Sequence, residues 1–191
     1  LFRDKNFTLG TITLSLSFFV LFGNLVLFPL WLQTQLGYTS LWAGLAAAPI
    51  GIMPLFIAPL IGILGHKMDL RILITMGFII FGLGAFWSTL FNTQINYQHL
   101  IVPRLFQGIG IPCFFIPLFS ILLSRIPKNQ ITSAIGLATF LRVLGGSFGA
   151  SLSVTFWEHR ESIHHSQLAE NITALNPIAT QAIHLLQTLG F

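Results

Sequence analysis

The feature that most constrains this chain is a long run without charged side chains. Between Lys5 and Lys67 the sequence contains no Asp, Glu, Lys or Arg. A membrane-spanning helix needs about 20 mostly apolar residues, so this run is too long for a single span. It is interrupted by the polar, turn-forming stretch QTQLGYTS at 33–40. We therefore expect two spans here, at about 7–32 and 41–65.

The composition agrees with a membrane protein. Of the 191 residues, 54% are hydrophobic and only 7% are charged, and the mean hydropathy is +0.82. Ordinary soluble domains carry about 25% charged residues, so this chain has too few charges to cover a soluble surface. We expect an all-α, polytopic bundle of transmembrane helices embedded in a lipid bilayer. The net charge of +4 is not gathered in a basic cluster, so we expect no nucleic-acid partner.

Three further polar breaks mark the rest of the spans. HKMDLR at 66–71, NTQINYQH at 92–99 and SRIPKNQ at 124–130 separate apolar segments at about 72–91, 100–124 and 132–157. After Trp157 the sequence becomes polar, and we expect 158–191 to lie outside the membrane. Because the sequence begins with Leu1 and not with methionine, we expect it to be a piece of a longer protein.

Cations are concentrated at one set of span ends. These residues are Arg3, Lys5, Lys67, Arg71, Arg125 and Lys128. The loops at 33–40 and 92–99 on the other side contain none. Loops rich in Lys and Arg remain in the cytoplasm, so we expect the first set of ends to be cytoplasmic and the C-terminal tail to lie on the opposite side.

Four polar side chains within the spans are candidates for a substrate path. Charged residues at membrane depth are costly and usually face a cavity or a partner. Arg104 lies about one turn inside the fourth span, where it either extends to the interface or faces a cavity. Arg142 lies halfway along the fifth span and is either a cavity contact or an interhelical latch. Asn24 and Gln107 are either contacts between helices or ligand contacts, and Gln107 shares a helix face with Arg104.

Small residues in the fifth span predict close helix packing. They form two pairs at helical spacing, Gly145-xxx-Gly149 and Ser147-xxx-Ser151. Helices in lipid associate through close contacts of this kind, because they lack a hydrophobic drive to come together.

The sequence contains no pattern that predicts catalysis. A membrane-embedded enzyme would need paired carboxylates, a Ser/His pair or metal ligands at membrane depth, and none is visible. Glu161 and His165 lie one helical turn apart, which is too little to predict a metal site, and we interpret this segment as a solvated helix. No phosphate-binding loop occurs, so an ATP-driven pump is not supported. A non-transporting membrane scaffold remains an alternative, although it gives no reason to keep Arg142.

Three stretches resemble a known family. They are R-x-x-Q-G-x-G within LIVPRLFQGIGIPCFFIPL, the loop GILGHKMDLR, and HRESIHHSQL in the tail. Together with the N-terminal spans, they resemble the major facilitator superfamily, in particular the EmrB-type multidrug efflux branch of fourteen-span drug:proton antiporters. The resemblance implies five of the six helices of a C-terminal bundle, with 158–191 leading toward a missing final span. It also implies a gate motif near the cytoplasm, whose candidate residues here are Gly62, Leu64, His66, Lys67, Asp69 and Arg71.

The resemblance further implies a function. Members export hydrophobic drugs and weak acids across the bacterial inner membrane by alternating access, driven by the proton gradient without a cofactor. EmrB-type proteins work with an EmrA-type periplasmic adaptor and a TolC-type outer-membrane channel. The N-terminus would then be cytoplasmic and the segment 158–191 periplasmic. Because no span contains Asp or Glu, we expect the proton carrier to lie in the N-terminal half of the longer protein.

Overall fold

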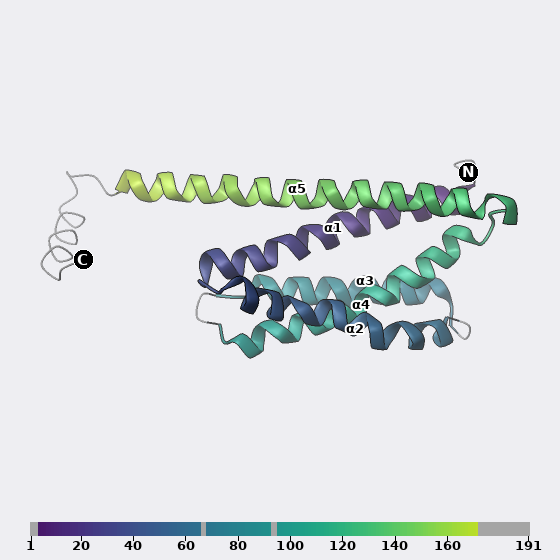
Figure 1. Ribbon diagram of the computed structural model, residues 1–191, viewed down its shortest axis with the longest axis horizontal. Coiled ribbons are helices and arrows are strands. Elements are labelled where there is room, and N and C mark those ends of the chain that lie inside the picture. Colours follow the sequence, from purple (N-terminus) through teal and green to yellow (C-terminus); the bar gives the residue numbers. More distant parts are fainter. Residues whose placement is uncertain (1–3, 66–67, 93–94, 172–191) are drawn as a thin grey trace, which may run out of the picture. The chain divides into compact units, whose positions relative to one another are not determined.

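Helices make up all the regular structure of the residues described here. The computed structural model describes residues 4–65, 68–92 and 95–171, with side chains to Ile163. The helices, shown in Figure 1, are α1 (Lys5–Gln35), α2 (Ser40–Leu64), α3 (Leu70–Thr89), α4 (Tyr97–Leu123), the short 3-10 helix η1 (Lys128–Gln130) and α5 (Ile131–Asn171). Five of them are long and apolar enough to cross a membrane, which confirms the predicted fold class.

The first four helices begin and end within one turn of the predicted spans, but α5 is longer than its predicted span. It starts where expected and then continues as helix past Trp157 to Asn171. The change to polar residues shows where the surface of the helix becomes suited to water. It does not interrupt the backbone hydrogen bonds, so the helix continues. The chain divides into two compact units, Leu1–Ser153 and Val154–Phe191. All packing described below lies within the first unit.

Local sequence explains where the first helices begin and end. The side chain of Asp4 caps α1 by accepting a hydrogen bond from the backbone N–H of Asn6 at 2.9 Å. Gly37, with φ +66°, lies in the turn between α1 and α2, a conformation that glycine adopts without strain. The prolines of α2 and α4 lie inside helices that remain continuous.

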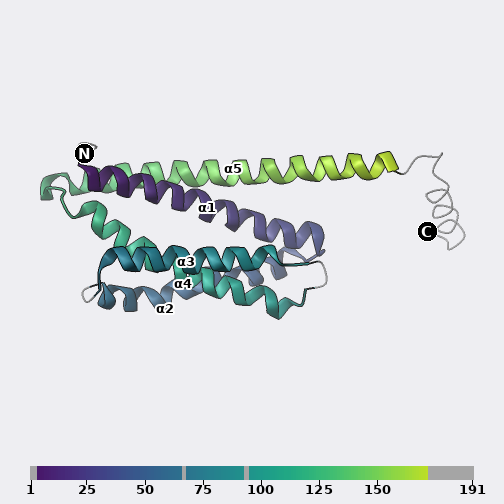
Figure 2. The ribbon, with the colours of Figure 1, turned by 180° about the vertical axis from the view of Figure 1, so that it is seen from behind.

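Helix α4 packs against α1, α2 and α3. In Figure 2, α3 lies along α4. Glycines allow these close approaches: a Cβ atom at Gly108 would lie 3.0 Å from the Pro49 carbonyl oxygen of α2, and one at Gly110 would lie 2.9 Å from the Gly77 carbonyl oxygen of α3. The two glycines of the R-x-x-Q-G-x-G motif therefore let α4 pack closely against both neighbours.

Helices α1 and α5 meet along a second glycine contact. A Cβ atom at Gly145 would lie 2.5 Å from the Ser15 carbonyl oxygen, and one at Gly149 would overlap the Phe19 carbonyl oxygen. The Ser15 hydroxyl also donates a hydrogen bond to the Leu141 carbonyl at 2.8 Å. Gly145 meets Ser15, and four residues further along each helix Gly149 meets Phe19. Because the contacts advance in the same direction on both helices, α1 and α5 run parallel here.

The serine pair of the predicted packing motif lies elsewhere on α5. Ser147 and Ser151 are exposed, whereas the glycine pair lies at the contact with α1. Of the two predicted pairs, the glycine pair therefore forms the contact between α1 and α5.

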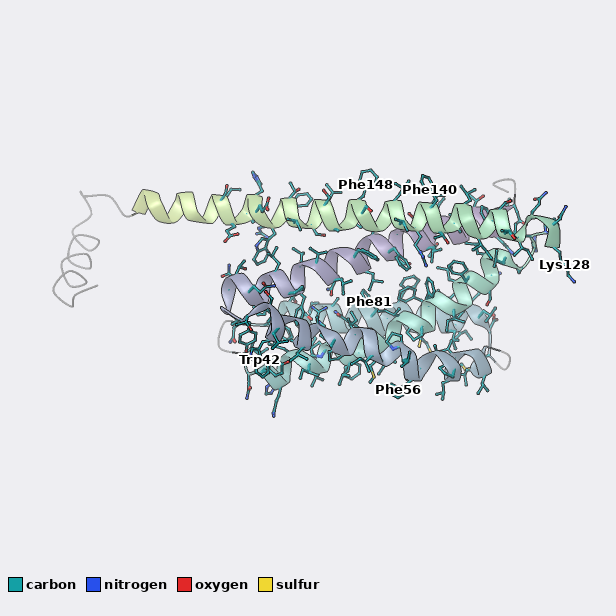
Figure 3. All side chains as sticks on the ribbon, viewed as in Figure 1. Trp42, Phe56, Phe81, Lys128, Phe140 and Phe148 are labelled. Carbon is teal, nitrogen blue, oxygen red and sulfur yellow. The ribbon has the colours of Figure 1, made fainter. Side chains whose placement is uncertain are left out.

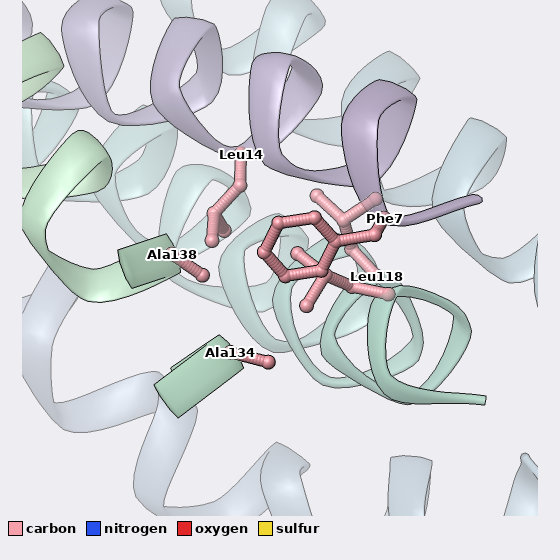
Figure 4. Close-up of a cluster of buried hydrophobic side chains, with 6 residues drawn as sticks. Phe7, Leu14, Leu118, Ala134 and Ala138 are labelled. Atoms are coloured by element: carbon pink, nitrogen blue, oxygen red, sulfur yellow. The ribbon is translucent and has the colours of Figure 1, made fainter. Parts of the chain in front are cut away.

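A buried apolar cluster joins α1, α4 and α5 at one end of the unit. It consists of Phe7, Leu14, Leu118, Leu122, Ala134 and Ala138 (Figure 4). Other large apolar side chains face outward: Phe140 and Phe148 project from α5 (Figure 3) and are 59% and 63% exposed. An apolar exterior of this kind suits contact with lipid or with other transmembrane helices.

Candidate substrate path

Three of the four polar candidates meet at one place between α1 and α4. Nη1 of Arg104 donates hydrogen bonds to Oδ1 of Asn24 and, at 2.8 Å, to Oε1 of Gln107. The guanidinium carbon of Arg104 lies 3.4 Å from the centroid of the Phe28 ring. Arg104 is 2% exposed, so its side chain lies inside the bundle and does not extend to the membrane surface. We call Asn24, Arg104 and Gln107 the polar cluster.

The polar cluster retains unused hydrogen-bond donors. Nε of Arg104 and Nε2 of Gln107 are buried and have no partner among the residues with described side chains. Gln107 is fully buried and lies against α3, where a Cβ atom at Gly84 would come within 2.8 Å of its Cγ. Buried donors are normally satisfied, so two orphaned donors in neighbouring side chains need an explanation.

Arg142 occupies a separate position on α5. Its guanidinium carbon lies 4.7 Å from the ring centroid of Phe18 on α1 and 5.7 Å from that of Phe115 on α4. The two rings are themselves in contact, with their centroids 5.7 Å apart. Aromatic faces attract cations, and this attraction is stronger away from water. The arginine therefore connects three helices through aromatic rings, and its Nε has no hydrogen-bond partner among the described side chains.

The two arginines form separate positively charged positions along α1. Arg104 stacks on Phe28 and Arg142 on Phe18. These phenylalanines are ten residues apart, which corresponds to about 15 Å along a helix axis.

The predicted gate residues lie at the connection between α2 and α3. Gly62 and Leu64 end α2, Asp69 precedes the first residue of α3, and Arg71 is exposed in its first turn. His66 and Lys67 lie outside the described residues, and the gate stays a prediction. Among the side chains that are described, no three His, Cys, Asp or Glu residues lie close enough to hold a metal ion.

Sequence reasoning found the polar groups but not their aromatic partners. Phe28 lies one turn after Asn24 on the same face of α1, and this spacing is a signal that sequence alone offers. The pairing of Phe18 and Phe115 with Arg142 depends on contacts among three helices, and the sequence carries no such signal.

The family of the chain follows from comparisons with known proteins. Residues 1–150 match the Major Facilitator Superfamily, and the chain belongs to this family. It is 48% identical over 188 residues to the fatty acid resistance protein FarB of Neisseria gonorrhoeae, covering 98% of the chain and 37% of that protein. It is 41% identical over 191 residues to the multidrug export protein EmrB of Haemophilus influenzae, covering 100% of the chain and 38% of that protein.

A third relative supports the same conclusion. The chain is 42% identical over 187 residues to the probable multidrug resistance protein EmrY of Escherichia coli, covering 97% of the chain and 36% of that protein. No solved structure matches the chain significantly. The chain spans little more than a third of the length of these relatives.

Proposed function

We propose that the longer protein containing this chain exports hydrophobic drugs and weak acids by proton-coupled alternating access. The observation that carries the proposal is 41–48% identity, over nearly the whole chain, to relatives named for multidrug export and fatty acid resistance. Alternating access places the substrate near the bilayer midplane, where two bundles rock around it. The chain would contribute five helices of the C-terminal bundle, and it would act as a transporter component and not as an enzyme.

The distribution of polar groups supports a path along α1, α4 and α5. Asn24, Arg104, Gln107 and Arg142 lie well inside these three helices, whereas α2 contains no amide or charged side chain along its whole length. Intramembrane ionisable residues are costly and usually serve a functional site. In our proposal these four residues border the substrate path.

The proton carrier would come from the rest of the protein. No Asp or Glu occurs between Asp4 and Asp69 or between Asp69 and Glu158. Intramembrane carboxylates commonly carry protons in transporters. We propose that the proton gradient is the energy source, that no cofactor is needed, and that an acidic residue outside this chain takes up the proton.

We also propose an orientation and partners. The charge distribution supports a cytoplasmic N-terminus and a periplasmic C-terminal segment in the bacterial inner membrane. This segment would lie on the side where an EmrA-type adaptor and a TolC-type channel continue the path outward. Thr39→Cys and Lys128→Cys, each in the full-length protein, test the orientation. An impermeant maleimide should label Cys at 39 in cells whose inner membrane is intact, and Cys at 128 only after that membrane is permeabilised; the reverse pattern would refute the orientation.

Deleting the full-length gene tests export. Cells lacking it should become more sensitive to lipophilic weak acids and should accumulate more drug, and a plasmid copy should restore both. A scaffold that does not transport would leave drug accumulation unchanged. Unchanged sensitivity together with unchanged accumulation would therefore count against the proposal.

A further inference from the structure

The guanidinium of Arg104 is buried, and no ion pair to it occurs among the residues with described side chains. It is 2% exposed, and the groups found in contact with it are two amide oxygens and the Phe28 ring. These groups are neutral. A buried cation normally has an anionic partner, because neutral groups repay only part of the cost of removing its hydration. The apolar spans of this chain contain no carboxylate, since no Asp or Glu occurs between Asp4 and Asp69 or between Asp69 and Glu158.

The unused donors of the polar cluster suit a carboxylate. Both hydrogen bonds of Arg104 leave from Nη1, which leaves Nε without a partner among the described side chains. Gln107 lies three residues later on the same helix face and accepts through Oε1, so its Nε2 group is also free to donate. A carboxylate has two oxygens that accept from two donors at once, and guanidinium groups match this geometry well.

We infer that the polar cluster is a binding site for one carboxylate, with Arg104 and Gln107 as its donors. Asn24 then acts as the neutral group that holds Arg104 in place when the carboxylate is absent. The carboxylate has two possible sources: a weak-acid substrate, in which case the inference rests on the proposed function, or an acidic side chain from the part of the protein outside this chain.

The first measurement tests a carboxylate that arrives as a ligand. Calorimetry on the purified full-length protein would compare dodecanoate with dodecanol, which has the same carbon chain and no charge. Losing a hydrogen bond to a charged group predicts that Arg104→Gln weakens dodecanoate binding at least about tenfold and leaves dodecanol binding unchanged. Arg125→Gln is the matched control, because Arg125 is exposed between α4 and α5; it should bind both compounds as the wild type does.

A second variant supplies the carboxylate from within the cluster. Gln107→Glu has nearly the same shape as the native residue, so it avoids the folding defect that loss of a buried partner can cause. If the carboxylate arrives as a ligand, the new carboxylate should pair with Arg104, raise the melting temperature of the ligand-free protein and abolish dodecanoate binding. A lower melting temperature with normal dodecanoate binding would contradict a site for a carboxylate ligand.

The ligand-free melting temperature also separates the two sources. If an acidic side chain of the protein occupies the site, Arg104→Gln lowers this temperature, leaves dodecanoate affinity unchanged, and is partly rescued by neutralising that acidic residue. If dodecanoate affinity is unchanged and no such neutralisation rescues Arg104→Gln, the inference is wrong. These measurements do not involve transport, so a protein that binds carboxylate without exporting drugs would refute the proposed function alone.

Discussion

The contact between α1 and α5 leaves no room for a side chain at Gly149. Replacing Gly149 with alanine would place a methyl group onto the Phe19 carbonyl oxygen. Backbone atoms cannot turn aside as a flexible side chain does, so the two helices must separate. Gly136 lies on the same helix, and a Cβ atom added there would meet no described atom within 4 Å, which makes Gly136→Ala the matched control.

The two substitutions should change the free energy of unfolding in opposite directions: Gly149→Ala should lower it, and Gly136→Ala should raise it. Forcing an extra methyl group into a well-packed contact typically costs about 1–3 kcal/mol. Replacing an unhindered glycine inside a helix with alanine typically stabilises by roughly 0.5–1 kcal/mol. The two variants should therefore differ by about 1.5–4 kcal/mol in the free energy of unfolding. A difference of about 1.4 kcal/mol already changes the ratio of folded to unfolded protein tenfold.

Equilibrium unfolding of the full-length protein measures this difference. Both variants would be purified in mild detergent and titrated with sodium dodecyl sulfate, with helix content followed by circular dichroism. Gly149→Ala should unfold at a lower mole fraction of dodecyl sulfate than the wild type, and Gly136→Ala at the same or a higher one. Equal midpoints for the two variants would refute the close parallel contact between α1 and α5.

Three other predictions follow from the polar groups and the single cysteine. Gly84→Ala should displace Gln107, because the new methyl group would overlap its Cγ, and should reduce drug export; normal export and stability would contradict this packing. Phe18→Leu should remove one aromatic partner of Arg142 and lower the unfolding free energy by about 0.5–2 kcal/mol; an unchanged unfolding free energy would show that the ring contributes nothing. Cys113, 8% exposed, should react with maleimide far more slowly in the folded than in the unfolded protein, and equal rates would show that α4 is misplaced.

Sequence patterns were sufficient to predict the first four helices and one side-chain pair. The lengths of the apolar segments and the polar breaks between them predicted the ends of the first four helices to within a turn. Lipid contact requires apolar side chains and water contact favours polar ones, so the sequence shows where each span ends. The pairing of Arg104 with Gln107 was also predictable, since residues three apart share a helix face. Both properties depend on residues that are close together in the sequence, so a sequence pattern is enough to predict them.

Contacts between distant helices could not be predicted in the same way. Nothing near Asn24 shows that its partner is Arg104, because that choice depends on how α1 crosses α4. The spacing of Gly145 and Gly149 predicted a close helix contact, but it did not show that the neighbouring backbone is that of α1. A solvated helix was expected after Trp157, but its polar composition did not show that it continues the fifth span without a break to Asn171.

Transport by the purified full-length protein in proteoliposomes tests the central claim most directly. The substrate should be a hydrophobic drug without a titratable group, since a weak acid would carry protons across the bilayer by itself. Antiport predicts that an acid-inside pH gradient drives the drug into the vesicles in exchange for protons, for either orientation of the protein, and that a protonophore abolishes this uptake. Drug uptake no faster than in protein-free vesicles, or uptake that ignores the pH gradient, would contradict proton-coupled export.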